Sequence, residues 1–233
     1  MNDENQRMLE ATADHLGPLL DEVIFVGGAT VELWITDEGA PEFRPTADVD
    51  VVVEITSRRD YYRFEKRVHA AGFLNDEESG VICRFKHSES GLILDVMPTE
   101  ASILGFKNRW QAEAFPHAVT RRLRSGREIR AIPPPFLLAT KLEAFSSRGE
   151  LDFLGSRDFG DAVVLIDGRE ELMEEVAAAP KPLRAYVRRR FEDLSKHRDF
   201  DRGLEGALPS SPEAGERVDL VIRPRIREII ALG

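Results

Sequence analysis

DVDVVVEI, residues 48–55, is the stretch of sequence that decides the fold. Its run of valines predicts a buried strand. Strand alternation then places the carboxylates of Asp48 and Asp50 on one face, about 6–7 Å apart, with Val49 and Val51 on the other. A second apolar run, VIFVGG at residues 23–28, predicts another buried strand that ends in a tight glycine turn. Two buried strands carrying polar groups at their ends indicate a sheet with a site at its edge.

Weaker patterns complete the first half of the chain. Residues 81–85 and 92–96 predict two strands of a hairpin joined by the polar turn HSESG, and residues 114–120 and 128–131 predict two more strands. Helices are expected over residues 5–20, 29–34 and 58–71, with Ser57 as the N-cap of the last and Gly72 as its stop. The acidic stretch at residues 36–45, which includes Asp37 to Glu42, is expected to be a loop.

The pattern changes at the PPP run, residues 133–135. Beyond it the apolar residues follow helical spacing, for example Leu183, Val187 and Phe191, with a loop expected at 207–215 and a last helix at 218–232. We therefore predict an α+β fold, in which a mixed-sheet core (residues 1–132) is followed by a helical C-terminal half (residues 133–233).

Composition excludes several classes of protein. The 233 residues carry a formal net charge of −10, which disfavours a general nucleic-acid coat protein. Cys83 is the single cysteine, so an internal disulfide and a cysteine-based zinc site are excluded. No apolar run approaches the roughly 18 residues of a membrane helix, and the polar first residues do not resemble a signal peptide. We expect a cytoplasmic protein without a membrane partner.

Three acids carry the chemistry that the sequence suggests. Asp95 stands inside the apolar strand LILDV, where a lone carboxylate would cost several kcal/mol without a partner. Asp48 and Asp50 repel each other unless a cation lies between them. Carboxylates suit Mg²⁺, with Mn²⁺ as an alternative, in a site shared with substrate phosphates. The bland alternative is a pair of solvated acids and an ordinary glycine turn; the three features in this order favour the metal site.

These motifs resemble a known superfamily. The GG pair at 27–28, RPTADVD at 44–50 and the strand residue Asp95 look like nucleotidyltransferases of the polymerase-β type. LLATKLEAFSSRG at 137–149 and SRDFGDAVVL at 156–165 resemble the AbiEii/MenT-like toxin branch, and the resemblance spans about residues 24–166.

The resemblance implies a role for each matching residue. Asp48 and Asp50 would hold the metal, and Asp95 would be a third ligand or the general base. Gly27, Gly28 and Thr30 would lie at the triphosphate of the bound NTP. Further nucleotide contacts are implied for Lys141, which is also an implied catalytic residue, and for Arg44 and Arg148. Asp158 and Asp161 would either contact the nucleotide or tune Lys141. An exposed mixed-charge helix face is the alternative for Lys141, and helix capping is the alternative for Asp158 and Asp161. The sequence departs from the branch in its long gap between Gly28 and Asp48 and in Arg157, where lysine is commoner.

Two basic clusters suggest where an acceptor could bind. One runs from Arg121 to Arg130 and the other from Arg184 to Arg190. Either could hold an RNA backbone, and a solvated helix face that pairs with the acidic run at residues 169–176 is the alternative for the second. We expect nucleotide transfer from an NTP to RNA, tRNA foremost, by the toxin of a toxin–antitoxin pair with a cognate antitoxin as protein partner. The alternatives are a small-molecule, antibiotic-type nucleotidyltransferase and a catalytically inactive nucleotide- or partner-binding module.

Overall fold

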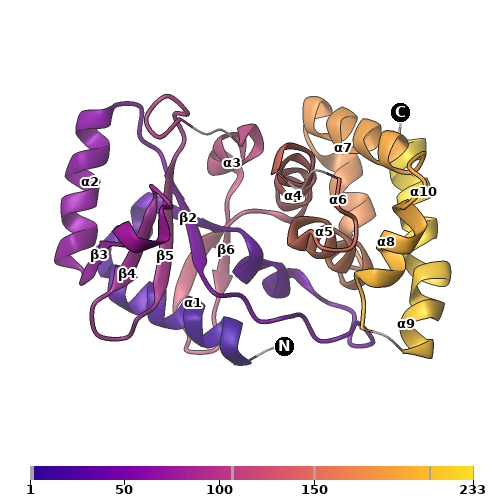
Figure 1. Cartoon of the computed structure of the whole chain (residues 1–233), viewed down its shortest axis with the longest axis horizontal. Helices are drawn as coiled ribbons and strands as arrows, with labels where there is room; N and C mark the ends of the chain where they lie inside the picture. The colour runs from indigo at the N-terminus through magenta and orange to yellow at the C-terminus, as the bar shows by residue number, and fades with distance from the viewer. Residues whose placement is uncertain (1–2, 106–107, 149–150, 210, 233) are drawn as a thin grey trace. The chain divides into compact units, whose positions relative to one another are not determined.

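The protein is described by a computed structural model that covers residues 3–105, 108–148, 151–209 and 211–232 (Figure 1). The fold is α+β, with a seven-stranded mixed sheet, as the sequence predicts. Contacts divide the chain into two compact units. The first comprises Met1–Glu32 and Arg44–Pro133, and the second comprises Leu33–Phe43 and Pro134–Gly233. The sequence places the boundary between residues 132 and 133; the second unit begins at Pro134 and also includes residues 33–43.

The first unit is built on one sheet, whose strand order is β3-β4-β5-β2-β1-β7-β6. The central pair β2 and β5 is parallel, as is the pair β1 and β7, and the other neighbours are antiparallel. The strands are β1 (Val23–Val26), β2 (Val49–Val53), β3 (Phe73–Asn75), β4 (Arg84–His87), β5 (Ile93–Pro98), β6 (Val119–Arg122) and β7 (Glu128–Ala131).

Helices pack against this sheet because their apolar faces match its buried valines. Ser57 caps α2 as expected, since its side chain accepts a hydrogen bond from the Asp60 N–H. The helices of the unit are α1 (Asp3–Leu16), α2 (Arg58–Ala70) and α3 (Arg109–Ala114), with 3₁₀ turns η1 (Gly17–Glu22), η2 (Gly28–Trp34), η3 (Glu77–Ser79) and η4 (Phe115–His117).

Two expected strand boundaries in this unit were wrong, and one strand was missed. The hairpin strand β4 begins at Arg84 instead of Val81, because Val81 and Ile82 are exposed and the Arg84 N–H closes a turn on the Val81 carbonyl. Residues 109–117 are helical and the strand β6 starts only at Val119; the Asn108 side chain caps α3 and begins the helical stretch. The short edge strand β3 was missed.

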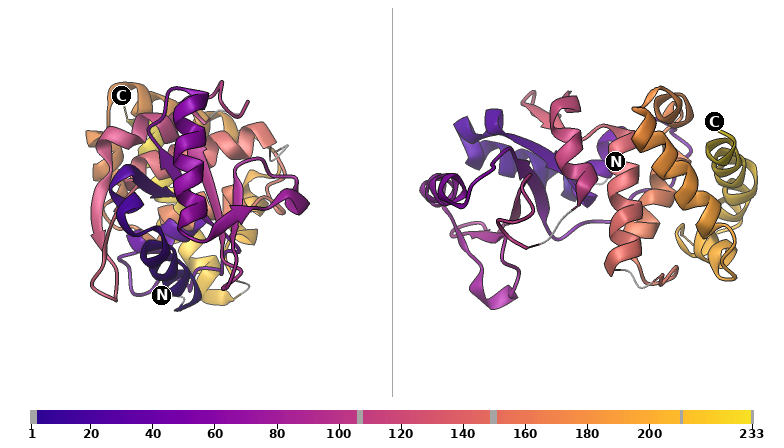
Figure 2. Two further views of the ribbon diagram at one scale, coloured as in Figure 1. Left: turned by 90° about the vertical axis from the view of Figure 1, so that its left-hand side faces the viewer. Right: turned by 90° about the horizontal axis from the view of Figure 1, so that it is seen from above.

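The second unit is helical (Figure 2). Helix α4 packs against α5 and α7, and α7 packs against α10. Phe145, Phe153 and Phe159 form an aromatic core with ring centroids 4.9–5.0 Å apart. A helix, α9, was missed in the expected loop at 207–215. The helices are α4 (Pro134–Arg148), α5 (Arg157–Gly168), α6 (Leu172–Ala178), α7 (Lys181–Leu194), α8 (Phe200–Gly206), α9 (Pro212–Arg217) and α10 (Arg223–Ala231), with a π turn at Val218–Ile222. Within the described ranges, no helix has the length and apolar character needed to cross a membrane.

Candidate functional site

Strand pairing brings the acids of the first unit together. In the parallel pair β2 and β5, Asp50 lies opposite Asp95. On the other side of β5, Arg84 of β4 lies opposite Asp95. Asp48 precedes β2 by one residue, on the Asp50 side of the alternation. We call Asp48, Asp50, Asp95 and Arg84 the sheet site.

Arg84 is the cation of the sheet site and was not singled out from the sequence. Its guanidinium donates hydrogen bonds to both oxygens of Asp95, each at 2.8 Å, and to Asp48 Oδ2 at 2.6 Å. The hydrogen bond to Asp95 is the main cause that raises the pKa of Arg84, so the group stays charged. Side-chain exposure is 20% for Arg84 and 10% for Asp95, so water screens this pair weakly. An arginine inside the apolar run VICRF was the signal that could have revealed it.

The glycine turn lies directly against Asp50. Gly27 has a φ of +74°, and a Cβ atom built on it would lie 1.8 Å from Asp50 Oδ2. Both observations demand glycine, the first for the backbone and the second for the space. The hydroxyl of Thr30, which is fully buried, donates to the Gly27 carbonyl at 2.9 Å and so stabilises the turn. Gly28 follows in the chain and begins η2.

A buried side chain of α1 holds the segment that leads into Asp48. Asn5 has no exposed surface; its amide nitrogen donates to the Arg44 carbonyl at 3.0 Å, and its oxygen accepts from the Thr46 N–H at 2.8 Å. The Thr46 hydroxyl in turn reaches the Asp48 carbonyl at 3.3 Å. Asn5 was not singled out from the sequence. Arg44, an expected phosphate contact, is half-buried in this segment.

Cys83 reports the negative potential beside the sheet site. It is buried, as expected, and burial is the main cause that raises the pKa of its thiol to about 12. The carboxylates of Asp95 and Asp50 add to that shift, because a thiolate next to them would be repelled.

In the second unit, the structure brings Lys141, Asp158 and Asp161 together. The Lys141 ammonium lies 2.6 Å from Asp161 Oδ2 and 3.2 Å from Asp158 Oδ1. All three residues are buried, in the packed helices α4 and α5. The one-turn spacing of the two aspartates lets both face one ammonium. Their side chains thus engage Lys141, one of the two roles that the resemblance allows for them. The side chain of Arg148, at the end of α4, lies outside the described residues.

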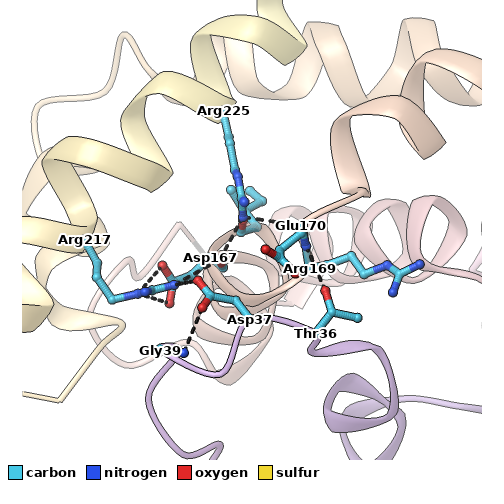
Figure 3. A network of polar contacts seen from close by, with 9 residues as sticks. Thr36, Asp37, Gly39, Asp167, Arg169, Glu170, Arg217 and Arg225 are labelled. Atoms are coloured by element: carbon cyan, nitrogen blue, oxygen red, sulfur yellow. Dashed lines mark hydrogen bonds and ion pairs between the residues drawn. The ribbon is translucent and has the colours of Figure 1, made fainter.

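A second ionic network fastens residues 33–43 within the same unit (Figure 3). Arg217 donates to both oxygens of the fully buried Asp167, at 2.9 and 3.0 Å, and to Asp37 Oδ2 at 2.5 Å. Burial raises the pKa of the Asp167 carboxyl, and the Arg217 guanidinium opposes that rise. Arg225 binds the carbonyls of Ile166 and Asp167 at the end of α5. The acidic loop was expected from the sequence, but this attachment was not.

The two basic clusters differ in exposure. Arg122, Arg124 and Arg127 are exposed on the hairpin of β6 and β7, and Arg127 pairs with Asp14 at 2.6 Å. In α7, only Arg189 is exposed among the four arginines. Their guanidinium groups bond within the unit, to the Ala177 carbonyl (Arg184), Glu192 (Arg188), the Ala185 carbonyl (Arg189) and the Ser146 hydroxyl (Arg190).

Pairing of α7 with the acidic run at residues 169–176 was the alternative interpretation of the second cluster. Two acids of that run, Glu171 and Glu175, pair with Arg169 of the same run. Comparison with protein-family models and with curated proteins found no match to this chain.

Proposed function

We propose that this chain is a metal-dependent nucleotidyltransferase that moves a nucleotide from an NTP to an acceptor, RNA and tRNA foremost. The observation that carries the proposal is the sheet site. Asp50 and Asp95 lie opposite each other on parallel strands, Asp48 shares Arg84 with Asp95, and a glycine turn lies against Asp50. Carboxylate oxygens are the donors that Mg²⁺ and Mn²⁺ prefer, so the donor set fits the proposed metal.

In this proposal, each residue of the first unit has a chemical task. Asp48 and Asp50 would hold Mg²⁺, which supplies charge stabilisation to the phosphates when bound. The turn at Gly27 and Gly28 would present backbone N–H groups to the triphosphate, and Thr30 keeps that turn in shape. Asn5 would position the segment before Asp48. In the second unit, Asp158 and Asp161 orient the ammonium of Lys141, for which the resemblance implies a contact with nucleotide phosphates.

The proposed transfer balances as a displacement at phosphorus. An acceptor hydroxyl oxygen forms a bond to the α-phosphorus of the NTP, and its proton passes to the Asp95 carboxylate. The bond from that phosphorus to the pyrophosphate oxygen breaks, and pyrophosphate leaves with the electron pair. Both oxygens of Asp95 accept hydrogen bonds from Arg84, which makes them weaker bases, so the proton transfer is favoured once Arg84 has moved away from at least one of them.

For RNA, the hairpin of β6 and β7 is the better supported surface. Arg122, Arg124 and Arg127 of this hairpin are exposed, whereas three of the four arginines of α7 are only partly exposed. Reversing the charge of Arg122 and Arg124 should weaken tRNA binding and flatten its salt dependence. The same change at Arg188 and Arg189 should act less. Equal salt slopes for the wild type and the hairpin variant would exclude this surface.

The test of the proposal is a labelling assay. Purified protein is incubated with each α-labelled NTP, Mg²⁺ and total tRNA, and the label on RNA is counted. We expect label with the wild type and a loss of about 10²–10⁴-fold with Asp48→Ala. Asp193→Ala, which removes an acid with a 66% exposed side chain from α7, is the matched control and should label normally. Near-normal transfer by Asp48→Ala would exclude the metal-site assignment.

A small-molecule acceptor is a second candidate, supported by a pocket that Arg84 lines. The pocket is open to solvent, has a volume of about 460 Å³, and is lined by the acids Asp76 and Glu77. An amine-bearing acceptor would fit these acids, so the labelling assay includes an aminoglycoside in parallel with tRNA. If RNA is the acceptor, the proposal includes a cognate protein antitoxin and a cytoplasmic location. No label on either acceptor, with no NTP binding, would favour an inactive binding module.

A further inference from the structure

We propose that Arg84 is an exchangeable counter-ion, which competes with the divalent cation for the carboxylate of Asp95. This inference rests on the proposed function, because it concerns how the sheet site changes when the metal binds. It assigns to Arg84 a positioning role.

Arg84 forms hydrogen bonds with both oxygens of Asp95. A carboxylate offers two oxygens, and the guanidinium of Arg84 takes both oxygens of Asp95 together with one of Asp48. Among the described residues, no three acidic, histidine or cysteine side chains are gathered into a ready-made metal cage. The acids of the sheet site are instead arranged around the arginine. A cation that uses Asp95 as its third ligand would bind the remaining lone pairs of these oxygens, close to the guanidinium of Arg84, so the two positive groups repel each other and compete for the carboxylate.

The sheet site carries more negative than positive charge. Three carboxylates and one guanidinium leave the sheet site with a net charge of −2 when all four groups are ionised. Removing Arg84 without replacement would leave Asp95, which is nearly buried, as an unpaired charge. A divalent cation replaces that charge, so metal binding and arginine release compensate each other. Arg84 in this way stabilises the metal-free sheet and lowers its affinity for metal.

An open pocket lies beside Arg84. Arg84 lines the pocket of about 460 Å³ described above, so its side chain borders the acids on one side and open volume on the other. Val81 and Ile82, which are exposed, and the acids Asp76 and Glu77 line the same pocket. A released guanidinium can turn into this volume and find apolar contact for its stem and carboxylates for its head. The exchange therefore needs no rearrangement of the strands.

Mn²⁺ binding, followed by electron paramagnetic resonance or calorimetry without nucleotide, tests this inference. A unit charge removed from about 5 Å of a divalent cation changes its affinity by roughly 10- to 100-fold at high effective dielectric. We therefore expect Arg84→Ala to bind Mn²⁺ more tightly by about that factor. Arg84→Gln, which keeps more of the side chain's packing, should do the same if the alanine variant does not fold. Arg63→Ala removes an exposed arginine of α2 and should change nothing.

A second substitution tests the competition for Asp95 itself. In the Arg84→Ala background, Asp95→Asn should abolish the gain in Mn²⁺ affinity, because the released carboxylate is then missing as a ligand. Unchanged or weaker binding by both Arg84 variants would overturn the inference, and so would an Asp95→Asn change without effect. If no variant binds Mn²⁺, the metal site of the proposed function fails as well. If Mn²⁺ binding behaves as expected but no nucleotide is transferred, the exchange holds and the transferase proposal fails.

Discussion

Replacing Gly27 by alanine is expected to displace the carboxylate of Asp50. The new Cβ would lie 1.8 Å from Asp50 Oδ2, and real Cβ contacts essentially never fall below 3.0 Å. The oxygen must therefore retreat by about 1.2 Å, or the turn must open by the same amount. Alanine would also adopt a positive φ, which costs about 1–2 kcal/mol. The substitution thus combines a backbone penalty with a displaced acid.

Gly80 separates these two effects. It has a φ of +70°, close to the +74° of Gly27, but a Cβ built on it meets nothing within 4 Å. Gly80→Ala should therefore show the backbone penalty alone. The difference between the two variants in the free energy of unfolding, measured by urea denaturation, should be about 1–3 kcal/mol, the usual cost of inserting a methyl group into packed space.

Displacement of Asp50 should also appear in function. An error of about 1 Å in a reacting group typically costs about 10²-fold in rate, so Gly27→Ala should lose about that much nucleotide transfer. Mn²⁺ affinity should fall in parallel, while Gly80→Ala keeps both. If Gly27→Ala were no less stable than Gly80→Ala and bound Mn²⁺ as the wild type does, the assigned contact between the turn and the acid would be refuted.

Three further predictions concern buried ionisable side chains. Lys141→Met should lower the free energy of unfolding by about 3–5 kcal/mol, because it leaves Asp161 buried without its ammonium; adding Asp161→Leu should recover part of the loss in the same urea titration. Arg217→Ala should cost about as much in thermal or urea unfolding, since it uncovers the charge of the fully buried Asp167, and Arg217→Lys should cost less. Burial and the neighbouring His15 lower the pKa of His87. As the pH falls, the unfolded chain therefore takes up the proton before the folded protein does. The stability that neutral His87 contributes above about pH 6.5 should be lost as the pH falls below that value. His87→Gln should flatten that dependence between about pH 7.5 and pH 5 in urea midpoints, and an unchanged slope would contradict it.

Local patterns predicted the centre of the sheet well. The valines of residues 49–53 and the run at 23–26 form strands because their side chains are buried on both faces, which is the property that an unbroken apolar run reports. The N-cap at Ser57 was predictable for a similar reason, since capping depends on residues within one turn. Such short-range causes are visible in a single sequence.

Long-range pairing explains what was missed. Arg84 acquires its meaning only when β4 pairs with β5 and brings it opposite Asp95. Asn5 becomes a structural partner of Thr46 only because α1 packs beside the segment that leads to β2, 41 residues away in sequence. For Arg84 the only local sign is its place in the apolar run VICRF, which does not tell which acid it meets, and the pairing of Asn5 has no local sign. The candidate acids could thus be named from the sequence, whereas the cation that holds two of them and the amide that holds their backbone could not.

The long gap between Gly28 and Asp48 has a structural cause that connects these observations. Residues 33–43 leave the first unit and belong to the second, where Gly168 accepts hydrogen bonds from the N–H groups of Thr36 and Asp37. Arg217 then fixes Asp37 to the buried Asp167. The chain thus runs from the glycine turn at Gly27 to the contacts of Thr36 and Asp37, and then returns to Asp48. The glycine turn and Asp48, the two arms of the sheet site, are therefore joined through this anchor. Loosening the anchor lengthens the free connection between the two arms, which raises the entropy that must be lost to hold them in place. Substitutions at Arg217 are therefore expected to weaken the sheet site as well as the helical unit.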